Sequence, residues 1–263
     1  VPRLFSRDGL DSSAGHEFTR QLNAITEHAA TVGVGIDMLC SLTTVGADWH
    51  THCPNVPAEW SEVRYLWDEW TLRLSGLDVV SIFPGDPGGC SRNGCTAETY
   101  IDRSVEISEI IRRNIPTVEI ELGTWGSPFW GWGTIEGPPG WQGEFIAEYQ
   151  HTAWRFDRER ADRSMEHLIH RLPDFPSDTS VAINMGFGCD GDPTGEADAR
   201  HWAHEIAKTN RIHTWDFSLT EGENAVFPHW RFDRLFAQRR EERDAAPYSG
   251  GICFTMTPLL NQL

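Results

Sequence analysis

Basic residues are scarce in this 263-residue chain, which has a single lysine, Lys208. Lysine and arginine together number 22 against 39 aspartates and glutamates, so the formal net charge is -17. A nucleic-acid-binding surface needs clustered basic side chains, and the deficit argues against such a partner. The chain also has no apolar run of about 18 residues, so the sequence predicts no membrane-spanning segment.

Several motifs that define common enzyme classes are missing as well. No Gly-x-Gly-x-x-Gly turn follows the first expected strand, and neither a P-loop nor a Gly-x-Ser-x-Gly elbow occurs. Dinucleotide-binding, NTPase and serine-hydrolase functions therefore have no support. No signal peptide is visible, and the opening Val1-Pro2-Arg3 in place of a methionine indicates a piece excised from a longer multidomain chain.

The six cysteines leave two kinds of site open. Four residues separate Cys90 from Cys95, so the pair can close a small disulfide in an oxidising compartment. A zinc site is the rival, although its spacing matches no compact zinc signature. Its candidate ligands are His50, His52 and Cys53, joined by Cys90 and Cys95. We expect no metal and no cofactor, and a secreted or periplasmic location over a cytoplasmic one.

What is present is a regular alternation of strands and helices. Apolar residues three and four apart predict the helices, and short β-branched runs predict the strands. The expected helices are residues 15–30, 59–74, 99–113, 145–172, 196–209 and 230–243. The expected strands are residues 32–40, 79–83, 117–122, 180–185, 211–219 and 250–256. Such alternation is typical of parallel βαβ units, and hence of an α/β fold.

Two α/β architectures fit this alternation, a closed (β/α)8 TIM barrel and an open doubly wound sheet. The missing nucleotide fingerprint disfavours the open sheet. Acids, tryptophans and long loops follow the strands, which is where a barrel forms its site. We therefore expect residues 1–263 to be a single TIM-barrel domain. Only six strands are expected, so the barrel would be incomplete at its N-terminus, with strands three to eight present.

Acidic residues recur at the ends of the expected strands. Glu119 and Glu121 share one face of their strand, because side chains alternate along a strand, and the apolar residues take the other face. Thr214, Asp216 and Ser218 share a face of a later strand in the same way. Burying such acids together is costly, and a functional site is the common reason for it. The further acids are Asp86, Asp190, Asp192 and Glu221.

Paired carboxylates in a cleft are the groups that glycoside hydrolysis needs, one protonated as an acid and one ionised. We name Asp86, Glu121, Asp216 and Glu221 as candidate catalytic residues. The chain also has twelve tryptophans, whose rings can stack on sugars. The candidate substrate-binding residues are Glu119, Trp125, Trp130, Trp132, Asp190, Asp192, Trp215 and Arg92. Asp86 and Asp192 each precede a proline, and a role in shaping a turn is the alternative for both.

Two segments carry a resemblance to a known group of proteins. Phe83-Pro84-Gly85-Asp86-Pro87-Gly88-Gly89 and Trp215-Asp216-Phe217-Ser218-Leu219-Thr220-Glu221-Gly222-Glu223 resemble bacterial glycoside-hydrolase-type TIM barrels. These barrels are distantly similar to α-glucuronidases and β-hexosaminidases. Hexosaminidases carry an adjacent Asp-Glu pair where this chain has Asp86-Pro87. The α-glucuronidase resemblance implies an inverting mechanism, with Asp86 or Glu121 as acid and Asp216 or Glu221 as base.

The expected function is therefore hydrolysis of a glycosidic bond in an oligosaccharide or polysaccharide, as in polysaccharide degradation. Neither a nucleic acid nor a membrane is an expected partner, and the sequence leaves a homo-oligomer open. One alternative is a non-catalytic carbohydrate-binding barrel whose acids bind sugar hydroxyls. Another is a metal-dependent hydrolase or isomerase barrel that uses His50, His52 and a carboxylate.

Overall fold

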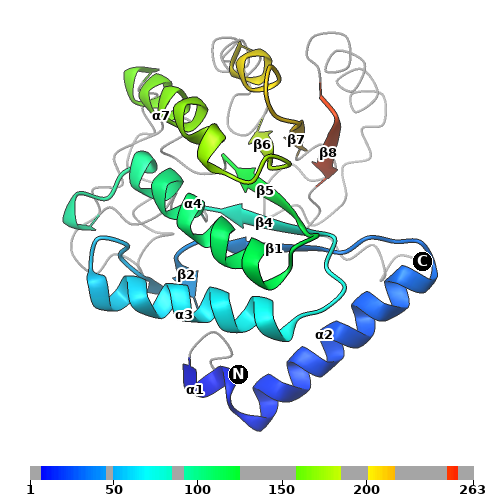
Figure 1. The fold of residues 1–263 in the computed structure, drawn as a ribbon. Helices are drawn as coiled ribbons and strands as arrows, with labels where there is room; N and C mark the ends of the chain where they lie inside the picture. Colours follow the sequence, from blue (N-terminus) through cyan, green and yellow to red (C-terminus); the bar gives the residue numbers. More distant parts are fainter. Residues whose placement is uncertain are drawn as a thin grey trace, which may run out of the picture. The chain divides into compact units, whose positions relative to one another are not determined.

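The computed structural model describes residues 7–45, 50–84, 92–124, 158–184, 201–216 and 248–253 (Figure 1). The chain divides into two compact units, Val1–Thr179 and Ser180–Leu263. Each unit combines parallel strands with helices. The expectation of an α/β fold is thus confirmed.

The first unit contains three parallel strands, in the spatial order β1, β4, β5. A short antiparallel hairpin of β2 and β3 follows β1. The strands are β1 (Asp37–Ser41), β2 (Thr44–Val45), β3 (His50–Thr51), β4 (Val79–Phe83) and β5 (Glu119–Gly123). The helices are α1 (Arg7–Leu10), α2 (Ser13–Thr31), α3 (Pro57–Arg73), η1 (Arg92–Gly94), α4 (Ala97–Asn114), α7 (Arg158–Arg171) and η3 (Leu172–Asp174).

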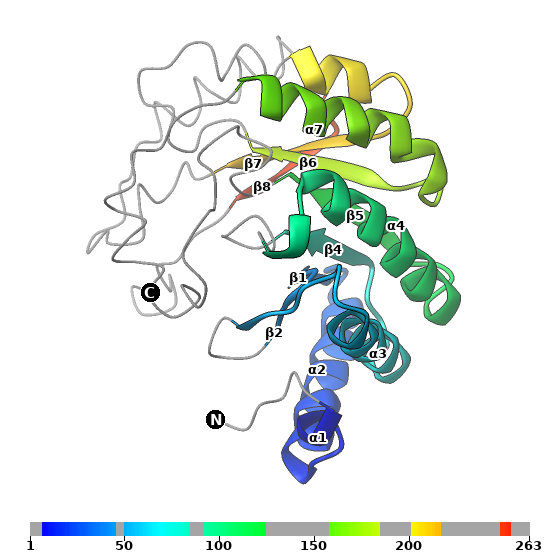
Figure 2. The ribbon, with the colours of Figure 1, turned by 90° about the vertical axis from the view of Figure 1, so that its left-hand side faces the viewer.

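Helices α3 and α4 lie on one side of this sheet (Figure 2). The apolar rows of β4 and β5 provide the packing face, with Val80, Ile82, Ile120 and Leu122 all 0% exposed. Alternation along each strand places the remaining residues on the opposite face. One face of the sheet therefore serves the core, and the other is free to carry polar groups.

Local signals in the sequence set the helix ends. The Ser12 hydroxyl accepts a hydrogen bond from the Gly15 amide at the start of α2. Thr96 and Thr99 form a reciprocal capping box at the start of α4. Pro57 opens α3, where its missing N–H is not needed. No helix within the described ranges is long and apolar enough to cross a membrane.

The second unit also has three parallel strands, in the order β6, β7, β8. These are β6 (Ser180–Asn184), β7 (Ile212–Asp216) and β8 (Gly250–Cys253). A helix between β6 and β7 includes residues 201–206 and buries Ala203 and Ile206 completely. This is the strand–helix–strand unit that the sequence predicts, with its helix between two parallel strands.

All six strands expected from the sequence are present, but the first begins later than expected. Residues 32–36 are not part of β1, which starts at Asp37. Val32 instead caps α2, with its amide donating to the Ala29 and Ala30 carbonyls. Gly33 follows with φ +71°, a left-handed conformation that ends the helix. Helix α1 and the β2–β3 hairpin are additions, too short to leave a periodic pattern.

Four of the expected helices are confirmed: α2, α3, α4 and the helix between β6 and β7. For residues 145–172, the part within the described ranges, 158–171, is helical as α7. The expected helix at residues 230–243 lies outside the described residues.

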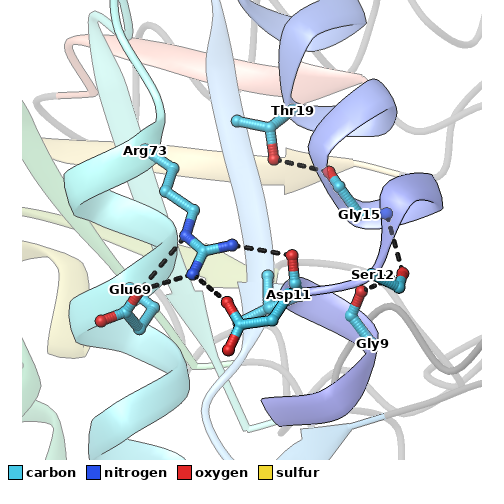
Figure 3. Close-up of polar contacts among 8 residues, drawn as sticks. Gly9, Asp11, Ser12, Gly15, Thr19, Glu69 and Arg73 are labelled. Carbon is cyan, nitrogen blue, oxygen red and sulfur yellow. Dashed lines mark hydrogen bonds and ion pairs between the residues drawn. The ribbon is translucent and has the colours of Figure 1, made fainter.

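Arg73 fastens the N-terminal helices to α3 (Figure 3). Its guanidinium donates to the Asp11 carboxylate at 2.6 Å, to Glu69 at 2.7 Å and to the Leu10 carbonyl at 2.7 Å. The corner between α1 and α2 is tight, since a Cβ on Gly15 would lie 2.3 Å from the Gly9 carbonyl oxygen. Arg73 thus donates hydrogen bonds to three acceptors close to a turn that only glycine at position 15 allows.

We expect Arg73→Met to lower the free energy of unfolding by about 1–2 kcal/mol, because it removes charged hydrogen bonds between elements distant in sequence. Arg20→Met is the matched control. Arg20 pairs only three residues away, with Glu17 on the exposed face of α2, and its loss should leave stability nearly unchanged. Urea unfolding followed by circular dichroism measures both variants. Equal effects of the two substitutions would contradict this role of Arg73.

Candidate functional site

The polar face of the first sheet brings three side chains together from three neighbouring strands. The register pairs Leu39 with Ser81 and Ser81 with Glu121, and Asp37 stands two residues before Leu39 on the same face. These three residues, Asp37, Ser81 and Glu121, are called the acid–serine cluster below. Glu119 lies on the same face, two residues before Glu121.

Ser81 is the centre of the acid–serine cluster. Its hydroxyl oxygen lies 2.8 and 2.9 Å from the two carboxyl oxygens of Asp37 and 3.1 Å from Glu121 Oε1. Ser81 is 0% exposed and Glu121 is 2% exposed, whereas Asp37 keeps an exposed surface at the start of β1. The cluster therefore runs from a solvent-accessible carboxyl group to a buried one.

The electrostatics of the cluster favour a proton on Asp37. Its carboxyl group reaches the buried Ser81 hydroxyl, and this desolvation raises the pKa of Asp37 to about 6. The negative charges of Glu121 and Glu119 act in the same direction, and the hydrogen bond from Ser81 opposes them. Asp37 is therefore poised to gain or lose a proton close to neutral pH.

One hydroxyl proton cannot serve two carboxylates at once, since serine has a single O–H donor. When Asp37 is protonated, its own O–H can donate to Ser81 Oγ, and Ser81 can then donate to Glu121. This arrangement satisfies the three groups as a chain. A chain of this kind can pass a proton between the exposed carboxyl group and the buried one.

The backbone around Glu121 is held by close packing next to the carboxyl ends of the strands. A Cβ on Gly123 would lie 2.0 Å from the Phe83 ring, so only glycine fits there. By alternation, Phe83 and Gly123 belong to the same face as Ser81 and Glu121. The buried Tyr100 hydroxyl lies 2.9 Å from the Ile82 carbonyl oxygen and 3.0 Å from that of Gly123. Tyr100 thereby joins β4 and β5 to helix α4.

The sequence-predicted site residues are distributed unevenly over the described part of the chain. Glu119 and Glu121 lie on one face of β5, as predicted. Trp215 and Asp216 are the last two residues of β7, and Arg92 is the first residue of η1. The other candidates lie outside the described residues: Asp86, Trp125, Trp130, Trp132, Asp190, Asp192 and Glu221.

The loop that suggested a zinc site is described in part. Cys53 and Cys95 lie close together, while Cys90 lies outside the described residues. Within the described ranges, no three histidine, cysteine, aspartate or glutamate side chains gather as metal ligands would. The pairing of Cys90 with Cys95 stays a prediction.

Sequence reasoning missed Asp37 and Ser81 as members of the site. Both were assigned to strands, but each was treated as an ordinary strand residue. The available signal was parity, because Asp37 and Ser81 each interrupt an apolar run at the position that faces away from the helices. Their meeting with Glu121 depends on the register between strands, which alternation within one strand cannot provide.

No protein-family model matches the chain, and no curated protein shows a significant match.

We expect the stability of Asp37→Asn relative to the wild type to increase as the pH rises from about 4 to about 6. The wild-type carboxyl group has a folded pKa of about 6 against 3.8 for its ordinary value. Within that window the folded state binds more protons than the unfolded state, so wild-type stability falls as the pH rises. The variant has no carboxyl group at this position, so its stability does not fall for this reason as the pH rises. Urea unfolding across the pH range measures the difference.

Asp68→Asn provides a control of opposite sign. Hydrogen bonds from Asn114 and Arg113 lower the pKa of Asp68. Asp68 therefore stabilises the fold above its unfolded pKa, and this contribution disappears as the pH falls. Its substitution should cost stability at neutral pH and little in acid. An Asp37→Asn difference that does not vary with pH would contradict the raised pKa.

Proposed function

We propose that the chain is most of the catalytic barrel of a glycoside hydrolase, with Glu121 as one of its site carboxylates. The observation that carries this proposal is the acid–serine cluster, in which a glutamate that is 2% exposed shares a serine hydroxyl with an aspartate. Two carboxyl groups in unequal environments are the basis of acid catalysis in glycosidases. Alternating helices and parallel strands support the barrel architecture.

Glu121 acts in this proposal as the general acid, which donates a proton to the leaving oxygen of the glycosidic bond. Asp37 is the positioning residue that resupplies the proton through Ser81. Its pKa of about 6 suits this task near neutral pH, since an efficient acid–base group titrates close to the working pH. The sequence offers Asp216 or Glu221 as the base that activates water, and that part of the mechanism stays a prediction.

The position of Glu121 along its strand also supports a functional role. It is the third residue of β5, followed only by Leu122 and Gly123 before the strand ends. Active sites of α/β barrels form at the carboxyl ends of their strands. Glu119 and Asp37 stand one row further from that end, and so suit supporting roles behind Glu121.

The experiment is a panel of aryl glycosides, including glucuronides and N-acetylhexosaminides, tested on the wild-type protein and on Glu121→Gln. We expect the wild type to hydrolyse at least one substrate and Glu121→Gln to lose about 10²–10⁴-fold in kcat/KM, the usual contribution of a general acid. Glutamine keeps the shape and can still accept a hydrogen bond from Ser81. Circular dichroism confirms that the variant is folded.

Glu109→Gln is the matched control, because Glu109 lies exposed on α4 and should be dispensable for turnover. Wild-type turnover that survives unchanged in Glu121→Gln would overturn the role of Glu121. Sugar binding without turnover in both the wild type and Glu121→Gln would indicate a non-catalytic carbohydrate-binding barrel instead of an enzyme.

A further inference from the structure

Two cysteine thiols from distant parts of the chain are in contact. Cys53 follows β3 and Cys95 precedes α4, and their sulfur atoms are 3.4 Å apart across a sequence separation of 42 residues. Cys53 is completely buried, whereas Cys95 is partly exposed. A disulfide bond is about 2.05 Å long, so the sulfurs need to approach by only roughly 1.3 Å.

Hydrogen bonds hold the Cys53 segment in place. The Cys53 amide donates to Glu59 Oε2 at 2.6 Å, and the Asn93 amide group donates to the Cys53 sulfur at 3.4 Å. Arg103 on α4 donates to the Pro54 carbonyl at 3.2 Å. On the other side, the Thr96 capping box fixes the chain immediately after Cys95. The proximity of the two thiols therefore follows from the packing of both segments.

Cys40, on β1, has a different environment. Desolvation, with a smaller contribution from the charge of Asp37, raises the pKa of the Cys40 thiol to about 12. The thiolate is the reactive form in disulfide exchange, so the raised pKa disfavours reaction at Cys40. Cys40 therefore serves as an internal reference for reactivity.

We propose that Cys53 and Cys95 form a disulfide bond by exchange with a low-molecular-weight disulfide such as oxidised glutathione. The partly exposed Cys95 thiolate attacks one glutathione sulfur, which forms a mixed disulfide and releases one reduced glutathione. Cys53, deprotonated, then attacks the Cys95 sulfur and releases the second. Two protein thiols are oxidised and one glutathione disulfide is reduced to two thiols, with the thiol protons passing to the released glutathione.

This bond differs from the Cys90–Cys95 pair that the sequence suggests. It would close a loop of 42 residues instead of a short one, and join the segment after the β2–β3 hairpin to the start of α4. Restricting a loop of this length in the unfolded chain stabilises the folded state. The inference does not depend on the proposed glycosidase activity.

The test equilibrates the full chain in buffers of increasing oxidised-to-reduced glutathione ratio, then blocks remaining thiols and maps a non-reduced digest by mass spectrometry. We expect a peptide that crosslinks Cys53 to Cys95, and a Tm that is several degrees higher in the oxidised protein. Cys90→Ser and Cys40→Ser should both keep the crosslink and the shift in Tm.

The Cys53→Ser variant separates the two exchange steps. In a Cys90→Ser background it should retain one glutathionyl group on Cys95, because Cys53 is the thiol that resolves the mixed disulfide in this proposal. Thiols that stay reduced at every ratio would overturn the proposal, as would a Cys90–Cys95 crosslink in the wild-type protein. These two outcomes are read on the wild type, so they decide the question even if Cys53→Ser does not fold.

Discussion

A carboxyl group that is 2% exposed, as that of Glu121 is, has lost nearly all its hydration, and the protein must replace what water supplied. The effective cost of burying an ionised group is several kcal/mol. The Ser81 hydroxyl lies 3.1 Å from Glu121 and can donate a hydrogen bond to it. The pKa of Asp37 is raised, which favours the protonated, neutral form of this neighbour over a second negative charge in the cluster. Buried Glu121, a shared hydroxyl and a protonatable Asp37 thus form one electrostatic unit.

The rest of the first unit depends on the strand geometry that makes this unit possible. Parallel pairing of β1, β4 and β5 aligns the three side chains on one face, while the apolar rows of β4 and β5 fill the core. Close contact of Phe83 with Gly123 and the bridging Tyr100 hydroxyl fix β4 and β5 near the cluster. A shift of one residue in this register would move Glu121 into the apolar core.

Much of this fold is predictable from the sequence, because periodicity and turn residues act locally. The alternation Val118, Glu119, Ile120, Glu121, Leu122 correctly predicts two faces for β5, with all three apolar residues fully buried. Val32 and Val34 were misassigned to β1 since their β-branched side chains imitate a strand, whereas Gly33 ends the preceding helix. The sequence brought Cys53 and Cys95 together only as candidate ligands of a zinc site, and their direct contact was not predicted because it depends on how distant segments pack.

The candidate site was predicted only in part for the same reason. Glu121 was identified because its own strand reveals its parity. Asp37 and Ser81 gain their importance from partners 44 and 40 residues away, which no local pattern encodes. Alternation within one strand predicts which face a residue lies on, but its neighbours on other strands depend on the register of the sheet.

The most direct test of this account is the free energy of unfolding of Glu121→Gln and Glu121→Met, measured at neutral pH by urea denaturation. If Glu121 is retained for chemistry at the expense of stability, replacing its buried carboxyl group should leave the protein equally stable or more stable. A loss of about 3–5 kcal/mol in both variants is the cost of breaking a buried structural ion network. That result would contradict the account and make the acid–serine cluster a structural element of the sheet.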